Sequence, residues 1–287
     1  MINIAVENNK HIVAKLFEPT TAVIASAVIA PAMGAPQSFY RHFAQWLADQ
    51  GVATLTFDYQ GMGQSATEHI KHCQADLLDW AQIDCSAALD FIKQRYPTLP
   101  TFWIGHSFGG QAVPLIKCQE KIDHVFTITS GNGYWRYNPP RLKQKIWFLW
   151  YFLTPITTAL MGYFPGSKLG IVADLPKKII KQWRLWCLHR DYMVGVEADQ
   201  IKQQFANMSL PVTAISFSDD ELLTFNSITT LHQLFSKSEC RFIEITPEQV
   251  GLKAIGHFGF FKAEHSQRLW HNLFLPQLTL ELNKHAK

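Results

Sequence analysis

Residues 101–110 read Thr-Phe-Trp-Ile-Gly-His-Ser-Phe-Gly-Gly, an apolar run that ends in the pattern Gly-x-Ser-x-Gly. The run predicts a strand, and residues 112–116 predict a helix after it. Such a strand–turn–helix holds the serine, Ser107, on a tight turn with its hydroxyl above the sheet. Glycines are needed at 105 and 109 because a side chain there would crowd the turn and the helix. The pattern alone also fits an ordinary strand-to-helix connection, so the rest of the chain decides.

The composition limits the class of protein that this chain can be. It has 287 residues, of which 47% are hydrophobic and 17% charged, and a net charge of +3. This balance is typical of a globular protein with a large core and does not indicate nucleic-acid binding. The five cysteines are scattered without a Cys-x-x-Cys pair, which favours reduced thiols over a disulfide framework. The first residues lack the charged and apolar regions of a signal peptide, so we expect a cytoplasmic protein.

One apolar stretch, residues 146–164, has nearly the length of a membrane helix. Its 19 residues carry no charge, and a transmembrane helix needs about 20. Pro155 and Gly162 interrupt the stretch. A span here would also separate Ser107 from the later residues that we expect to meet it. We therefore predict no stable membrane span and interpret the stretch as buried or substrate-facing helices.

Strand and helix patterns alternate along most of the chain. The edge pattern of alternating apolar and polar side chains occurs at residues 2–6 and 11–17. Further strands are predicted at residues 22–30, 52–57, 122–129, 212–217 and 241–245, and helical stripes at residues 39–47, 77–92 and 269–275. This alternation predicts an α/β fold with a mostly parallel sheet and helices on both faces.

The alternation stops between residues 131 and 207. This part holds five of the nine tryptophans and has no clear buried strand, and the alternation resumes at residue 212. We therefore expect an α/β core formed by residues 1–130 and 208–287, with a helical cap inserted at residues 131–207. A cap over Ser107 would exclude water and set substrate choice.

A serine nucleophile needs a base within hydrogen-bond reach and an acid that orients the base. In an open α/β sheet such groups gather at the carboxyl ends of the strands. The acidic residues 219–221 follow the predicted strand at residues 212–217, and His257 follows the last predicted strand. The order serine, acid, histidine, each after a strand, is much more specific than the serine motif alone.

These motifs resemble those of the α/β-hydrolase superfamily over most of the chain. The resemblance rests on the serine turn, the loop at residues 58–65, the acid loop and the Gly256-His257 pair. Three further segments are similar to a group of predicted hydrolases: Gly133-Tyr134-Trp135, Gly162-Tyr163-Phe164-Pro165 and residues 256–261. The superfamily implies an eight-stranded sheet, a cap inserted after the sixth strand, and hydrolysis by a serine triad.

The resemblance also implies a role for each member of the triad. Ser107 matches the nucleophile, His257 the general base, and Asp220 the acid that orients the base. In the superfamily the acid commonly lies three residues after a glycine that closes the strand, and Phe217 stands at the place of that glycine. This departure leaves the neighbouring acids, above all Asp219, as alternatives.

An oxyanion hole is a further implication of the resemblance. It would use the backbone N–H groups of Met33 and Phe108. The superfamily often has His-Gly before the first of these donors, where this chain has Pro31-Ala32. A backbone donor needs no particular side chain, so Met33 can still serve.

The tryptophans of the expected cap are candidates for the wall of a substrate pocket, since binding sites are mostly apolar. They are Trp135, Trp147, Trp150, Trp183 and Trp186. The same side chains could instead form the core of the cap. We expect a small-molecule substrate, a partly hydrophobic carboxylic ester or thioester, cleaved through an acyl-enzyme. The alternatives are amidase, peptidase-like or lipase-like activity on the same triad, and a non-catalytic binding protein.

Two other motifs point weakly to cofactors. Gly61-x-Gly63-x-x-Ala66 matches a degenerate dinucleotide fingerprint, but the next strand ends without the acid that such a site requires. His69-x-x-His72-Cys73 could suggest a metal site, but no second ligand pair with zinc-like spacing is evident. We therefore expect no cofactor and no metal.

Overall fold

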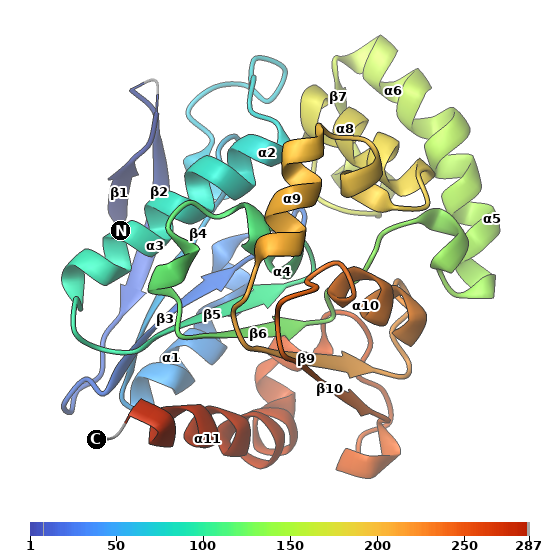
Figure 1. Ribbon diagram of the computed structural model, residues 1–287. Coiled ribbons are helices and arrows are strands. Elements are labelled where there is room, and N and C mark those ends of the chain that lie inside the picture. Colours follow the sequence, from blue (N-terminus) through green and yellow to red (C-terminus); the bar gives the residue numbers. More distant parts are fainter. Residues whose placement is uncertain (8, 286–287) are drawn as a thin grey trace.

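The continuous apolar runs of the sequence form the centre of an eight-stranded sheet (Figure 1). The computed structural model describes residues 1–7 and 9–285. The strand order is β1-β2-β4-β3-β5-β6-β9-β10. The strands are β1 Ile2–Ala5, β2 His11–Phe17, β3 Ala25–Ala30, β4 Val52–Phe57, β5 Thr101–His106, β6 His124–Ile128, β9 Val212–Phe217 and β10 Cys240–Ile245. Only the pairs β1–β2 and β2–β4 of this sheet are antiparallel, so the predicted mostly parallel sheet with an antiparallel edge is confirmed.

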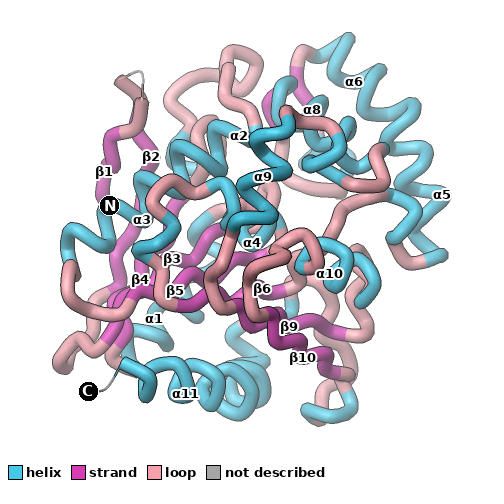
Figure 2. Tube along the Cα trace, viewed as in Figure 1, coloured by secondary structure: helices cyan, strands magenta, loops and turns pink. Residues whose placement is uncertain are grey.

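Helices cover both faces of this sheet, as Figure 2 shows. Outside the segment between β6 and β9, the helices are α1 Arg41–Asp49, α2 Leu77–Asp79, α3 Cys85–Arg95, α4 Phe108–Gln111, α10 Phe225–His232 and α11 Leu275–His285. Neighbouring side chains of β3 point to opposite faces. Val28 packs in the cluster that contains Leu89 of α3, and Ile29 packs in the cluster that contains Phe43 of α1 and Leu278 of α11. Strands β3, β4, β5, β6 and β9 are therefore buried on both sides, which explains why their sequences are mostly apolar and carry no Asp, Glu, Lys or Arg side chain.

The segment between β6 and β9 is mostly helical and lies at the upper right of Figure 1. Its helices are α5 Pro140–Phe148, α6 Thr154–Met161, α7 Gly166–Leu169, α8 Lys177–Leu188 and α9 Asp199–Asn207. It also contains an antiparallel pair of two-residue strands, β7 Tyr163–Phe164 and β8 Leu175–Pro176. The expectation of no buried strand here was wrong, because strands of two residues leave no apolar run in the sequence.

A π-helical segment, Leu149–Leu153, joins α5 to α6 in one continuous helix. Leu149 and Trp150 are buried, but the flanking Phe148 and Phe152 are 54% and 44% exposed. The interpretation of residues 146–164 as buried or substrate-facing was therefore wrong for one face of this helix. None of the described helices is both long enough and apolar enough to cross a bilayer.

Candidate active site

The serine turn has the strained backbone that its sequence predicts. Ser107 directly follows β5 and has φ +50° and ψ −111°, a conformation that costs about 1–3 kcal/mol for a residue with a side chain. A Cβ on Gly109 would lie 2.2 Å from the carbonyl oxygen of Ala30, so only glycine fits there. The predicted helix over residues 112–116 was wrong. The helix runs from Phe108 to Gln111, and Pro114 follows in a 3₁₀ turn because proline lacks the N–H for another α-helical bond.

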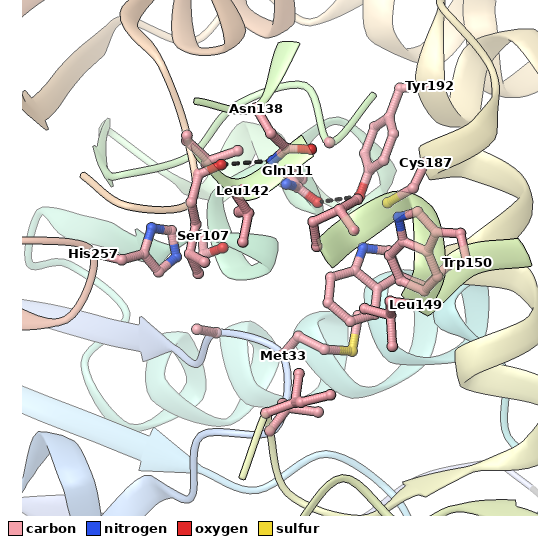
Figure 3. A pocket seen from close by; sticks show the side chains of 18 of the residues that line it. Met33, Ser107, Gln111, Asn138, Leu142, Leu149, Trp150, Cys187, Tyr192 and His257 are labelled. Carbon is pink, nitrogen blue, oxygen red and sulfur yellow. Dashed lines mark hydrogen bonds between the residues drawn. The ribbon is translucent and has the colours of Figure 1, made fainter. Parts of the chain in front are cut away.

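Ser107 opens onto an apolar cavity of about 150 Å³ between the sheet and the inserted segment (Figure 3). The sheet side supplies Ala32, Met33, Ser107, Gln111, Leu222, Leu223, His257 and Phe258. The inserted segment supplies Gly133, Asn138, Leu142, Ile146, Leu149, Trp150, Ile171, Val172, Trp183, Cys187 and Tyr192. No Asp, Glu, Lys or Arg side chain is among these lining residues. The cavity therefore suits an uncharged, largely apolar group.

Most of the polar side chains in the wall are already hydrogen-bonded to protein. Tyr192 Oη donates to Gln111 Oε1 at 3.0 Å, and Gln111 Nε2 donates to a backbone carbonyl at 2.8 Å. Asn138 Nδ2 donates to the carbonyl of Leu222 at 2.6 Å. The dashed lines in Figure 3 mark the bonds of Tyr192 and Asn138. These groups shape the wall, and Ser107 and His257 are among the polar groups that remain able to meet a ligand.

Sequence patterns did not point to Gln111, Asn138 or Tyr192. Gln111 carried a usable signal, because it lies four residues after Ser107, at the spacing of one helical face. Asn138 and Tyr192 reach the cavity only through the tertiary fold, and no local pattern marks them. The residues of a cavity wall that come from distant segments can thus be predicted only in part from local sequence.

His257 and Asp220 form a buried pair beside Ser107. The Nδ1 atom of His257 lies 2.8 Å from Asp220 Oδ2, and the two side chains are only 3% and 2% exposed. A carboxylate can only accept, so Nδ1 carries the proton and Nε2 is left as an acceptor. The other carboxylate oxygen accepts from the N–H groups of Leu222 and Leu223, at 2.8 and 2.9 Å. Asp220 is therefore held in one orientation toward the ring.

The two acids that flank Asp220 contact backbone instead of the ring. Asp219 accepts from the N–H groups of Ile255 and Gly256, at 2.7 and 3.1 Å. Glu221 Oε2 accepts from the N–H of His257 at 3.0 Å. The three consecutive carboxylates thus fix the histidine loop and the histidine ring separately.

Ser107 and His257 line the same end of the cavity, and Figure 3 draws their side chains next to each other. The expected hydrogen bond between the Ser107 hydroxyl and the His257 ring is not among the hydrogen bonds of the described residues. Catalytic hydrogen bonds are often long without substrate and tighten when it binds. The structure thus places both groups at the same cavity without a hydrogen bond between them in the described chain, and we expect substrate binding to bring them into contact.

The two backbone N–H groups that the sequence predicts for an oxyanion hole have no backbone partner among the described residues. Phe108 is the first residue of α4, and an N–H at that position has no partner within its helix. Met33 lines the cavity, and its N–H makes no backbone hydrogen bond in the described chain. The N–H of the preceding residue, Ala32, is used by Tyr40 Oη at 2.9 Å, which fixes the loop before Met33.

The predicted tryptophans divide into two groups. Trp150 and Trp183 line the cavity, with their rings edge to face at 5.1 Å. Trp135, Trp147 and Trp186 are not among the lining residues. Trp186 is buried in the core of the inserted segment and donates to Glu197 at 2.6 Å, and Trp147 is 44% exposed.

Cys187 is the other nucleophile-bearing residue of the wall. Burial raises the pKa of its thiol well above the usual value. A thiolate is required for nucleophilic attack, so this cysteine stays neutral at physiological pH. Ser107 has no rival nucleophile in the wall.

The dinucleotide-like glycine motif has a structural explanation. A Cβ on Gly63 would lie 2.5 Å from the Asp58 carboxylate, and that carboxylate accepts from the N–H groups of Gln64 and Gln37. The loop that could cradle a phosphate is therefore filled by an acidic side chain. Within the described residues, no group of three or more His, Cys, Asp or Glu side chains is placed to hold a metal ion.

Comparison with known proteins gives a family match and structural neighbours. Residues 21–157 match the family described as "Serine aminopeptidase, S33", a match over less than half of the chain. The structure of DcsB in complex with its substrate analogue has a TM-score of 0.66 at 12% identity, covering 99% of this chain and 98% of that chain.

Two further solved structures are also similar to this chain. Est1E from Butyrivibrio proteoclasticus, with ferulic acid bound, has a TM-score of 0.58 at 16% identity and covers 100% of both chains. A thermostable carboxyl esterase from Bacillus coagulans has a TM-score of 0.58 at 11% identity, with coverage of 85% and 89%. At such identities these likenesses concern the fold. Taken with the strand order and the serine turn, the matches show that the chain has the fold of the α/β hydrolases.

Proposed function

We propose that this chain is a serine hydrolase that cleaves a carboxylic ester with a small, partly hydrophobic acyl group through an acyl-enzyme on Ser107. One arrangement carries the proposal. The strained Ser107 turn and the ring of the His257–Asp220 pair open onto one apolar cavity. A serine, a base and an orienting acid in this relation are the parts that nucleophilic acyl transfer requires.

In this mechanism His257 Nε2 takes the proton of the Ser107 hydroxyl as its oxygen attacks the ester carbonyl. The N–H groups of Met33 and Phe108 stabilise the negative charge that develops on the carbonyl oxygen. The protonated ring then gives its proton to the leaving alcohol, while Asp220 keeps Nδ1–H and stabilises the positive ring. Water, activated by the same ring, attacks the acyl-enzyme and releases the acid.

The cavity wall supports an ester over a peptide with a free N-terminus. Holding a free α-amine calls for a carboxylate, and the lining residues include no Asp or Glu. Asp220 is occupied beneath the His257 ring. The lining also has no Lys or Arg that would pair with a carboxylate or phosphate on the substrate. The four arginines of the inserted segment therefore have no part in this proposal.

The size of the cavity supports a short acyl group. An apolar cavity of about 150 Å³ holds a molecule of roughly six carbon atoms, as benzene in an engineered cavity illustrates. Longer chains would have to leave the cavity past Leu142, Ile146 and Ile171, which lie in its wall. We therefore expect turnover to be highest for short acyl esters.

The test is labelling with a fluorophosphonate probe, followed by turnover of p-nitrophenyl esters of increasing acyl length. Ser107→Ala should lose both labelling and turnover while its circular dichroism spectrum stays that of the natural protein. Ser167→Ala, at an exposed serine, is the matched control and should keep both. Unchanged turnover by purified Ser107→Ala would refute the mechanism, and absence of turnover and labelling in the natural protein would favour the binding-protein alternative.

A further inference from the structure

One face of the helix formed by α5, the π-helical segment and α6 is apolar and exposed. We call it the apolar face, and it consists of Trp147, Phe148, Tyr151, Phe152, Ile156 and Leu160. These side chains are between 43% and 81% exposed, with Leu160 the most exposed. The helix lies at the outer edge of the molecule in Figure 1. An apolar patch of this kind commonly marks an interaction site.

The aromatic side chains of the apolar face pack against one another. Phe148 and Phe152 are stacked with ring centres 5.9 Å apart. Trp147 lies 5.2 Å from Phe152 and 5.8 Å from Tyr151. The face is thus an ordered aromatic surface before any partner binds, so little side-chain entropy remains to be lost on docking.

The stretch of sequence that contains this face carries charge of one sign. Between Asp123 and Asp174 the sequence has no acidic residue and five basic ones: Arg136, Arg141, Lys143, Lys145 and Lys168. None of these five takes part in an ion pair among the described residues. Aromatic and aliphatic side chains flanked by unpaired basic ones are the composition of helices that lie in the interface of an anionic membrane.

We propose that the apolar face docks on an anionic lipid surface, with the helix lying in the plane of the headgroups. A second copy of this chain is the less favourable occupant, because a two-fold contact would bring the basic residues of both copies together without an acidic partner. A lipid surface satisfies the apolar side chains and the basic side chains at once.

The apolar face lies close to the Ser107 cavity, which strengthens this assignment. This step of the inference rests on the proposed function of Ser107. A surface groove of about 650 Å³ runs beside the face, lined by Phe148, Leu153 and Gly170 among others. Its lining shares four residues with the Ser107 cavity: Leu142, Ile146, Leu149 and Ile171. A docked molecule would hold this groove against the bilayer, so that a membrane-dissolved ester could pass between these residues into the cavity.

The experiment is co-sedimentation of the whole chain with vesicles of phosphatidylcholine, with or without about one third phosphatidylserine. We expect binding to the anionic vesicles that weakens with added salt. Phe152→Ser/Ile156→Ser/Leu160→Ser should lower the partition coefficient at least tenfold, about what the lost apolar burial implies. These residues line neither the cavity nor the groove, so turnover of a water-soluble ester should stay unchanged. Arg141→Gln/Lys145→Gln should lower binding by about fivefold for each charge removed.

The matched control is Ile24→Ser/Leu280→Ser, which removes two apolar side chains of similar exposure, 48% and 47%, away from the inserted segment. It should bind vesicles like the natural chain. Ser107→Ala should also bind normally, so a failure of the hydrolase mechanism is distinguishable from a failure of docking. The proposal is overturned if anionic vesicles are not bound, or if the triple variant binds as well as the control. A dimer in sedimentation equilibrium that the triple variant dissolves would instead assign the face to a second copy.

Discussion

The hydroxyl of Tyr40 lies 2.8 Å from Nδ1 of His106. Tyr40 Oη accepts from the N–H of Ala32, so its own proton goes to Nδ1, and His106 Nε2 donates to the carbonyl of His257 at 3.1 Å. This donor order requires a neutral His106, and burial lowers the pKa of that ring well below its usual value. One chain of hydrogen bonds therefore joins the loop before Met33 to the loop that carries the proposed base.

Tyr40→Phe breaks this chain at its centre. The N–H of Ala32 and His106 Nδ1 both lose a buried partner, which should lower the free energy of unfolding by about 1–3 kcal/mol. We expect kcat on a soluble ester to fall about tenfold or more with little change in KM, because the loops on either side of Ser107 lose their alignment. Tyr59→Phe is the matched control, since it removes a buried hydroxyl that donates to Pro31 of the same loop but has no link through His106 to the His257 loop. Equal losses of kcat in both variants would contradict a positioning role for Tyr40.

Asparagine substitutions should separate the neighbouring acids. In Asp220→Asn the His257 ring loses the carboxylate that fixes its proton on Nδ1, and turnover should fall by about 10⁴, as in the serine-protease case. Asp219→Asn weakens only the backbone bonds to Ile255 and Gly256, and should mainly lower stability. Steady-state turnover and urea unfolding of both variants test these roles. A large loss of turnover confined to Asp219→Asn would mean that Asp219, and not Asp220, orients the His257 ring.

Trp183→Ala should change the preferred acyl length. Trp183 lines the cavity and packs against Trp150, so its removal lengthens the space available to the acyl group. We expect the ratio of kcat/KM for long over short acyl esters to rise by about tenfold. Trp147→Ala, outside the cavity wall, is the control and should keep the natural profile. If the acyl-length profile shifts equally in both variants, the cavity wall at Trp183 does not determine the preferred acyl length.

His232 should make the protein less stable in mild acid. Both of its ring nitrogens are used, by Thr127 Oγ1 at 2.9 Å and by the carbonyl of Ile228 at 2.7 Å, and burial lowers its pKa to about 4. The unfolded chain therefore takes up a proton near pH 6.5 that the folded chain does not. The stability that the neutral ring contributes is complete above that pH and is lost as the pH falls towards 4.

The expected loss from this residue is about 2 kcal/mol on going from neutral pH to about pH 5. Urea unfolding at both pH values measures it. His232→Gln should lose less stability over this interval than the natural chain, whereas His42→Gln, at an exposed histidine, should follow the natural chain. If His232→Gln loses as much stability between the two pH values as the natural chain, other groups cause the loss of stability in acid.

The strands were the most predictable part of the fold. β4 and β9 begin and end at the predicted residues, because burial on both faces leaves an uncharged, mostly apolar run with sharp ends. β3 begins three residues later than predicted, since residues 22–24 are as apolar as the strand but lie before it, with Ile24 48% exposed. Apolar composition alone cannot distinguish a buried residue from an exposed neighbour.

The site was predictable where chemistry and chain order coincide. Ser107, Asp220 and His257 each follow a strand, so a parallel sheet had to bring them to one edge. Tyr40 and His106 are 66 positions apart, and nothing local marks them as partners. The sequence also did not predict that the apolar face on α5 and α6 is exposed. A hydrophobic run shows that its side chains are apolar, but not whether they point to the core or to solvent.

The π-helical turn at Leu149–Leu153 places one residue more in this helix than an α-helical path would hold. Deleting one residue there would restore α-helical spacing and rotate everything after it by about 100° relative to α5. Ile156 and Leu160 would leave the line that they share with Phe148 and Phe152, and the buried Thr154 and Thr158 would lose their places. This helix should therefore tolerate substitutions that keep its exposed side chains apolar but few changes in its length. Homologues that keep the docking face should differ here in side-chain identity and not in the number of residues.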